Sequence, residues 1–292
     1  MRLRRIISSA IPAAAATVIV MWLVCTESLA QAPSGTQRSQ PSANQNPAQP
    51  TVAAGEQDRD AALQAKDELG KGTALTRKGL FSDAIPHLLA ARGRVSNEYA
   101  ASFNLALCYV ATRNFKQALQ VLDELRRGGH DGADVENLLA QAYVGSAKPA
   151  EAFASVRKAA GITPQNEKLY LFVADACVDS GDYSLGIKVV DLGLSNLPQS
   201  PRLHYERAML LSLLDEFDQA KEDFALASKL APESETAYLS ASQEATFEGN
   251  VPEAIRFARE GIRKGFENPA LLTILGRALL HSGVSPDQPE FV

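Results

Sequence analysis

The sequence of 292 residues is poor in the side chains on which most catalytic and metal sites depend. Its four histidines (His87, His130, His204 and His281) lie far apart, and no HExxH or CxxC pattern gives the ligand spacing of a zinc site. The chain also lacks a glycine-rich phosphate loop and a GxSxG nucleophile turn. We therefore predict no catalytic residue, no cofactor and no bound metal.

A strong charge of one sign is also missing. The formal net charge is −5, and no basic stretch is interleaved with aromatic residues, which argues against nucleic acid as a partner. Acidic pairs do occur, at Asp215-Glu216 and Glu222-Asp223. We interpret these pairs as solvated helix faces or helix ends and not as catalytic carboxylates.

The first thirty residues have the pattern of an export signal. Arg2, Arg4 and Arg5 precede an apolar run over residues 11–24, and small residues follow around Ala30. The run is shorter than the roughly 18 residues that a membrane-spanning helix requires. We predict a signal peptide over residues 1–30 and a periplasmic or secreted protein. The alternative is an uncleaved anchor in the inner membrane, the one case in which the membrane would be a partner.

Residues 31–57 differ from the rest of the chain in composition. Pro, Gln, Ser, Asn and Ala follow one another there with almost no large apolar side chain. Such a segment cannot bury enough apolar surface to fold, so we predict a disordered linker. Residues 58–292 would then form the folded part.

A period of 34 residues runs through this folded part. Six small residues recur at that spacing late in each unit, at Ala84, Ala118, Ala152, Gly186, Ala220 and Ala254. A second series lies nearer the start of each unit, at Gly72, Ala106, Ala140, Ala174, Ala208, Ser242 and Gly276. The register places the starts of seven units at residues 65, 99, 133, 167, 201, 235 and 269.

Each unit reads as two helices joined by a tight turn. Helix A takes roughly the first fourteen residues and helix B roughly the eighteenth to the thirtieth, with apolar residues at helical spacing. Turn glycines fall at one place in four units (Gly79, Gly181, Gly249 and Gly283), and Pro164, Pro198 and Pro232 close helix B in three. We predict that the small residues lie where helices A and B cross closely.

These features resemble the tetratricopeptide repeat family, from about Ala65 to Gly283. The stretch 167–234 is the most typical, with SGDYSLGIKVVDLGLSNLP and EFDQAKEDFALASKLAP. The resemblance implies an all-α fold, a right-handed α-solenoid of helix–turn–helix units, in which each unit is stabilised by its neighbours. Arg207 departs from the family pattern, because it stands at a position that is usually apolar.

The resemblance also implies a partner-binding groove. In the family the concave wall consists mainly of helix A, at its second, fifth, ninth, twelfth and thirteenth positions. Such a groove suits an extended peptide or an amphipathic helix of another protein. Some of these side chains could instead pack between neighbouring A helices. The candidate groove residues are Phe103, Leu107, Val110, Asn137, Gln141, Lys168, Leu171, Asp175, Arg202, Tyr205, Met209, Leu239 and Gln243.

Two further expectations follow from the register. Cys108 and Cys177 lie on helices A two units apart, farther than a disulfide can bridge, and should be buried free thiols. The seventh unit supplies helix A but ends at Val292 without helix B. We expect the natural chain to continue, with a partner that covers this end as the alternative.

The sequence therefore predicts a non-catalytic protein–protein interaction scaffold in the bacterial envelope. It would bind a partner peptide or helix in the concave groove. One alternative is the substrate-positioning arm of a larger enzyme whose catalytic domain lies beyond Val292. Another is self-association through the open end of the array.

Overall fold

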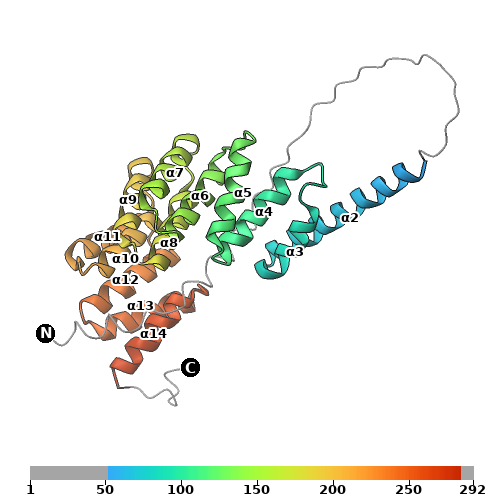
Figure 1. Cartoon of the computed structure of the whole chain (residues 1–292). Coiled ribbons are helices and arrows are strands. Elements are labelled where there is room, and N and C mark those ends of the chain that lie inside the picture. The colour runs from blue at the N-terminus through green and yellow to red at the C-terminus, as the bar shows by residue number, and fades with distance from the viewer. Residues whose placement is uncertain (1–51, 284–292) are drawn as a thin grey trace. The chain divides into compact units, whose positions relative to one another are not determined.

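The computed structural model describes residues 52–283, which form thirteen α-helices and no β-strand (Figure 1). The helices divide into two compact units, and the division falls in the chain between His130 and Asp131. The described part of the N-terminal unit is residues 52–130, and that of the C-terminal unit is residues 131–283. The division falls two residues before the predicted start of the third repeat, so it separates whole repeats.

The N-terminal unit holds four helices, α2 (Val52–Arg77), α3 (Phe81–Ala91), α4 (Glu98–Ala111) and α5 (Phe115–Arg127). Each packs on the next, and α2 also packs on α4. Helix α2 has 26 residues and begins at Val52, so residues 52–57 are helical and not part of a disordered linker as the sequence predicts. The predicted signal peptide and residues 31–51 of the predicted linker lie outside the described residues.

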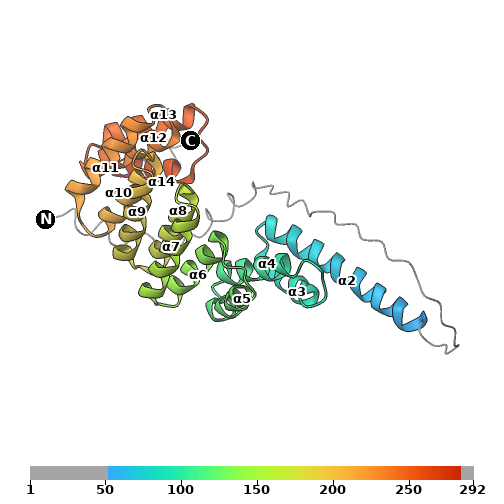
Figure 2. The same ribbon diagram turned by 90° about the horizontal axis from the view of Figure 1, so that it is seen from above.

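The C-terminal unit holds nine helices in residues 131–283 (Figures 1 and 2). Helix A of each repeat packs on its own helix B and on helix A of the next repeat, which is the arrangement of a solenoid. The predicted all-α solenoid of helix–turn–helix units is thus confirmed. The A helices are α6 (Ala133–Gly145), α8 (Glu167–Ser180), α10 (Pro201–Leu213), α12 (Glu235–Phe247) and α14 (Pro269–His281), and the B helices are α7 (Pro149–Ile162), α9 (Tyr183–Asn196), α11 (Phe217–Leu230) and α13 (Val251–Arg263).

The tight turn between helices A and B has one backbone conformation in every repeat. The fifteenth residue of each unit has a positive φ, which is left-handed backbone that favours glycine. Gly79, Gly181, Gly249 and Gly283 have φ between 71° and 82°, and Arg113, Ala147 and Asp215 hold the same conformation with φ between 55° and 62°. Helix B begins two residues later, one residue earlier than the sequence predicts.

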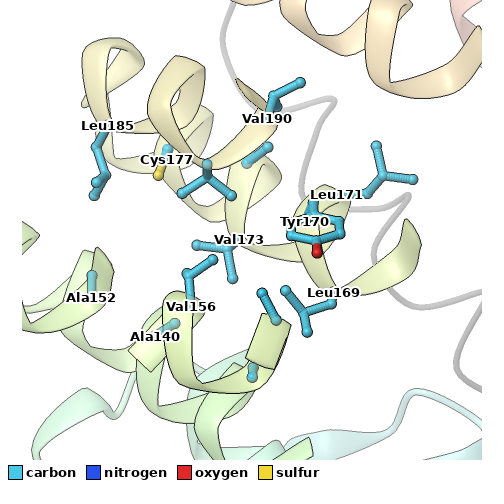
Figure 3. Packing of buried hydrophobic residues seen from close by; sticks show 14 of the residues in the cluster. Ala140, Ala152, Val156, Leu169, Tyr170, Leu171, Val173, Cys177, Leu185 and Val190 are labelled. Atoms are coloured by element: carbon cyan, nitrogen blue, oxygen red, sulfur yellow. The ribbon is translucent and has the colours of Figure 1, made fainter. Parts of the chain in front are cut away.

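The small residues of both series lie at helix crossings, as predicted. Thirteen positions belong to the two series, and all except Gly276 are buried. In the C-terminal unit, side chains from α6, α7, α8 and α9 point into one shared interior, among them Val156, Tyr170, Val173 and Val190 (Figure 3). In the described part of the chain, no helix is both long and apolar enough to cross a membrane.

Candidate partner-binding surface

Helices α6, α8, α10, α12 and α14 pack in sequence, so the same face of each A helix contributes to one wall of the C-terminal unit. Positions 2, 5 and 9 of a helix share a face because they are three or four residues apart. The predicted groove residues that remain accessible on this wall are called here the A-helix surface. They are Gln141, Lys168, Asp175, Arg202, Tyr205, Met209 and Gln243, of which Arg202 is exposed and the others are half-buried.

Three predicted groove residues do not belong to this surface, because Asn137, Leu171 and Leu239 are buried. The amide of Asn137 has a structural role, since its Nδ2 donates a hydrogen bond of 2.8 Å to the carbonyl oxygen of Leu169 on the next A helix. Gln141 Nε2 in turn donates to Asn137 Oδ1 at 2.7 Å. The side chain of Asn137 therefore joins α6 to α8 instead of facing a partner.

The predicted residues Phe103, Leu107 and Val110 lie on α4 and are all half-buried. The ring of Phe103 stacks on Tyr99 with a centroid separation of 5.6 Å. Because they belong to the N-terminal unit, these three residues form a candidate surface of their own.

Tyr205 and Met209 stand between the core and the solvent. Both pack against a buried cluster of Ala208, Leu211, Ala220 and Phe224, and the ring of Tyr205 lies 5.8 Å from that of Phe224. The inner part of each side chain therefore supports the junction of α10 with α11. Only the remaining half-exposed part is accessible to a ligand.

The carboxylates on α8 and α10 are partly dehydrated. Burial raises the pKa of Glu206 to about 8, with Asp175 adding to the effect and Arg202 opposing it. Burial likewise raises the pKa of Asp175 to about 6, with Asp179 nearby. Where burial keeps water away from a carboxylate, either protonation of that carboxylate or a cationic group of a ligand beside it is favoured. Sequence reasoning missed Glu206, whose only signal is its place beside Tyr205 on a helix with many buried residues.

A buried network on α10 and α11 was also missed. Asp223 is buried, not solvated as predicted, and it accepts hydrogen bonds from Arg207 Nε at 2.6 Å and Nη2 at 2.8 Å. His204 Nδ1 lies 2.8 Å from Asp223 Oδ1, and Arg207 Nη1 also donates to Asp191 at 2.9 Å. This network explains why a charged residue can occupy the usually apolar position 207.

The His204–Asp223 pair resembles half of a catalytic triad. The second ring nitrogen of His204, however, already makes a hydrogen bond. His204 Nε2 lies 3.1 Å from the carbonyl oxygen of Pro198. A carbonyl oxygen can only accept, so Nε2 must carry a proton and donate it. The imidazole therefore has no free nitrogen that could act as a general base. Its role is to tie α10 to α11 and to the end of the preceding repeat.

The two cysteines of the described region have little capacity for chemistry. Cys108 and Cys177 are buried free thiols, as predicted. Burial raises the pKa of both thiols, that of Cys177 to about 12, so the reactive thiolate is scarce at neutral pH. Within residues 52–283, no three His, Cys, Asp or Glu side chains gather in a way that could hold a metal ion.

Comparisons with known proteins agree with the repeat register. Family models described as tetratricopeptide repeat match residues 75–142 and residues 201–234. The second match coincides with the fifth predicted unit. No curated protein matches the sequence.

Among solved structures, the chain is similar to a tetratricopeptide repeat protein from Parabacteroides merdae, with a TM-score of 0.53 and 15% identity over 78% of this chain and 89% of that one. It is also similar to PilW, a type IV pilus biogenesis factor, with a TM-score of 0.50 and 18% identity over 72% and 98% of the two chains. At such low identity both likenesses concern the fold. Arrays of this fold are in general non-catalytic and bind other proteins along extended surfaces. The 34-residue register, the consecutive helix pairs and the two family matches together show that this chain contains tetratricopeptide repeats.

Proposed function

We propose that this protein is a non-catalytic scaffold that binds a peptide or helix of a partner protein on the A-helix surface of its C-terminal unit. The observation that carries the proposal is the combination of apolar and acidic side chains on that surface. Tyr205 and Met209 are half-exposed apolar side chains, and they share the wall with dehydrated Asp175 and Glu206. Apolar anchors beside a few charged groups are typical of peptide-binding grooves.

The chemistry of the surface limits what the partner can be. An apolar side chain of the partner would pack against Met209 and the exposed edge of Tyr205. The carboxylates of Asp175 and Glu206 would favour a Lys or Arg side chain, because a cation offsets the cost of ionising them in a dehydrated place. Lys168 and Arg202, at the second position of their helices, would fix the direction of the bound segment.

The export pattern of residues 1–30 supports a place for this scaffold in the envelope of a bacterium. Fractionation of cells that produce the full chain tests this location. A protein found in the periplasm or medium with residues 1–30 removed would agree with it. Recovery of the uncut chain in the cytoplasm would contradict it.

The binding proposal is tested by site-specific photo-crosslinking in the native cells. A photoreactive residue at Met209 should capture a defined partner, and one at Leu226 should not. Leu226 is the control because it is an exposed apolar residue of comparable size, on helix B. Binding of the captured partner should then be weakened about tenfold or more by Met209→Lys and left unchanged by Leu226→Lys. Equal effects of the two substitutions would refute the proposed surface.

A further inference from the structure

A single thioether lies on the A-helix surface. Met209 is the only methionine within residues 52–283, since the other two of the chain are Met1 and Met21. It occupies the ninth position of α10 and is half-buried. The inner part of the side chain packs against the buried cluster around Phe224, and the remainder is open to solvent. An oxidant dissolved in water can therefore reach this side chain in the folded protein.

The other two sulfur atoms of the described region are shielded from solvent. Cys108 and Cys177 are both 0% exposed, and Figure 3 shows Cys177 among the side chains that fill the interior of the C-terminal unit. The Sγ atom of Cys108 also lies 3.3 Å from Thr76 Oγ1. Burial raises the pKa of both thiols, so little of the thiolate that reacts with peroxides is present at neutral pH. Met209 should therefore be the first of these sulfur atoms to react with an oxidant.

We propose that Met209 is an oxidation site, at which a peroxide converts the thioether to a sulfoxide and thereby weakens the binding of the partner. The inference rests on the proposed function, because it concerns the same surface. In the reaction, a lone pair of Sδ bonds to one oxygen of hydrogen peroxide while the O–O bond breaks. The proton on the transferred oxygen passes to the departing oxygen, which leaves as water. The sulfur is oxidised and the peroxide is reduced.

The sulfoxide weakens binding because it adds a polar oxygen to an apolar contact. In the free protein, water solvates this oxygen, which is a hydrogen-bond acceptor. A partner that covers Met209 with an apolar side chain removes that water and leaves the oxygen without a donor. One buried acceptor left without a hydrogen bond corresponds to a loss of about tenfold or more in affinity.

Mass spectrometry of the purified full chain tests the chemistry without a partner. After mild treatment with hydrogen peroxide, peptide mapping should find Met209 heavier by one oxygen atom and should find Cys108 and Cys177 unmodified. In urea, where the chain is unfolded, all three residues should react. The far-UV circular dichroism of the oxidised chain should match that of the untreated chain. Oxidation of the cysteines before Met209, reaction of Met209 only in urea, or loss of the helical signal would each overturn the inference.

Photo-crosslinking in the native cells tests the effect on binding, with the photoreactive residue at Gln243, the ninth position of α12. Three proteins are each compared with themselves before and after peroxide: the chain with Met209 intact, Met209→Leu, and Met209→Leu combined with Leu226→Met. Leu226 is exposed on α11, so the third protein keeps one accessible thioether away from the A-helix surface. Peroxide should reduce capture of the partner about tenfold in the first protein. In the other two, capture after peroxide should equal capture before it.

The outcomes separate this inference from the proposed function. Equal capture before and after peroxide in the chain with Met209 intact would overturn the inference and leave the scaffold proposal standing. An equal loss of capture in either of the other two proteins would do the same, because the loss would then not depend on a sulfoxide at position 209. Absence of a captured partner in all three proteins before peroxide would overturn both. A loss confined to the chain with Met209 intact would support both.

Discussion

Gly193 provides a stringent test of how closely the repeats pack. A Cβ atom added there would lie 2.8 Å from Cγ and 3.0 Å from Cδ2 of Tyr170, and 3.1 Å from Cδ1 of Leu203. The Tyr170 ring would have to retreat by about 0.6 Å to reach ordinary contact. It is fully buried, its hydroxyl donates to the carbonyl oxygen of Pro164 at 2.9 Å, and it accepts a hydrogen bond from Asn196 at 3.1 Å. Two hydrogen bonds therefore hold the hydroxyl end of the ring in place.

Overpacking of a core by one methyl group costs about 1–3 kcal/mol, and the better helix propensity of alanine offsets up to about 1 kcal/mol of this. Gly193→Ala should thus lower the free energy of unfolding by about 1–2 kcal/mol. The matched control is Gly161→Ala on α7, where an added Cβ has nothing within 4 Å. That control should stabilise the protein, by up to about 1 kcal/mol.

Urea denaturation of the full chain, followed by far-UV circular dichroism, measures both variants. Hydrogen exchange in α8 and α9 shows whether the loss in Gly193→Ala is local. Stabilisation by both substitutions alike would refute the close approach of α9 to Tyr170. It would also show that close packing does not explain why glycine occupies position 193 of α9.

Three other predictions concern charge and backbone strain. Ala147→Gly should raise the free energy of unfolding by about 1 kcal/mol, because φ at this residue is 55°, and thermal denaturation would detect it. Asp223→Asn should lower that free energy by about 2–3 kcal/mol, since it weakens a buried ion-paired network, whereas Asp191→Asn at the half-exposed end should cost well under about 1 kcal/mol. Because the folded-state pKa values of Glu206 (about 8) and Asp175 (about 6) lie above the usual values near 4, the folded state holds these protons more tightly. The contribution of these two groups to stability should be largest below about pH 4 and fall, by on the order of a few kcal/mol, as the pH rises to about 8; urea titrations of Glu206→Gln should show this fall reduced above pH 6.

The fold could be predicted from the sequence because each of the seven repeats requires the same types of residue at the same positions. A small residue at each helix crossing and a left-handed residue at each turn are set by backbone geometry, so they recur at a fixed spacing. Where glycine is absent from the turn, as at Arg113 and Asp215, the other repeats still locate the turn. The part of α2 that precedes residue 65 was not predicted, because nothing in the repeat pattern describes a segment before the first unit.

The polar network on α10 and α11 could not be predicted for a related reason. His204 and Asp223 are nineteen residues apart, and each alone has the appearance of a surface residue. Their burial depends on facing each other across helices A and B, and Glu68 and His87 meet at the same two positions of the first repeat with a separation of 2.5 Å. Comparing repeats at both positions together, instead of one position at a time, would have revealed the pairing.

Comparing equivalent positions of the repeats also reduces the set of residues on the A-helix surface that we expect to contact a partner. At the fifth position of helix A in the third to sixth repeats, Asn137, Leu171 and Leu239 are buried and Tyr205 is half-buried. At the ninth position, Gln141, Asp175, Met209 and Gln243 are all half-exposed. Adjacent A helices close over the fifth position, so side chains there mainly set the spacing between repeats. Selectivity for a partner should therefore reside in the ninth-position residues, which differ in charge and polarity from one repeat to the next while their backbone positions repeat.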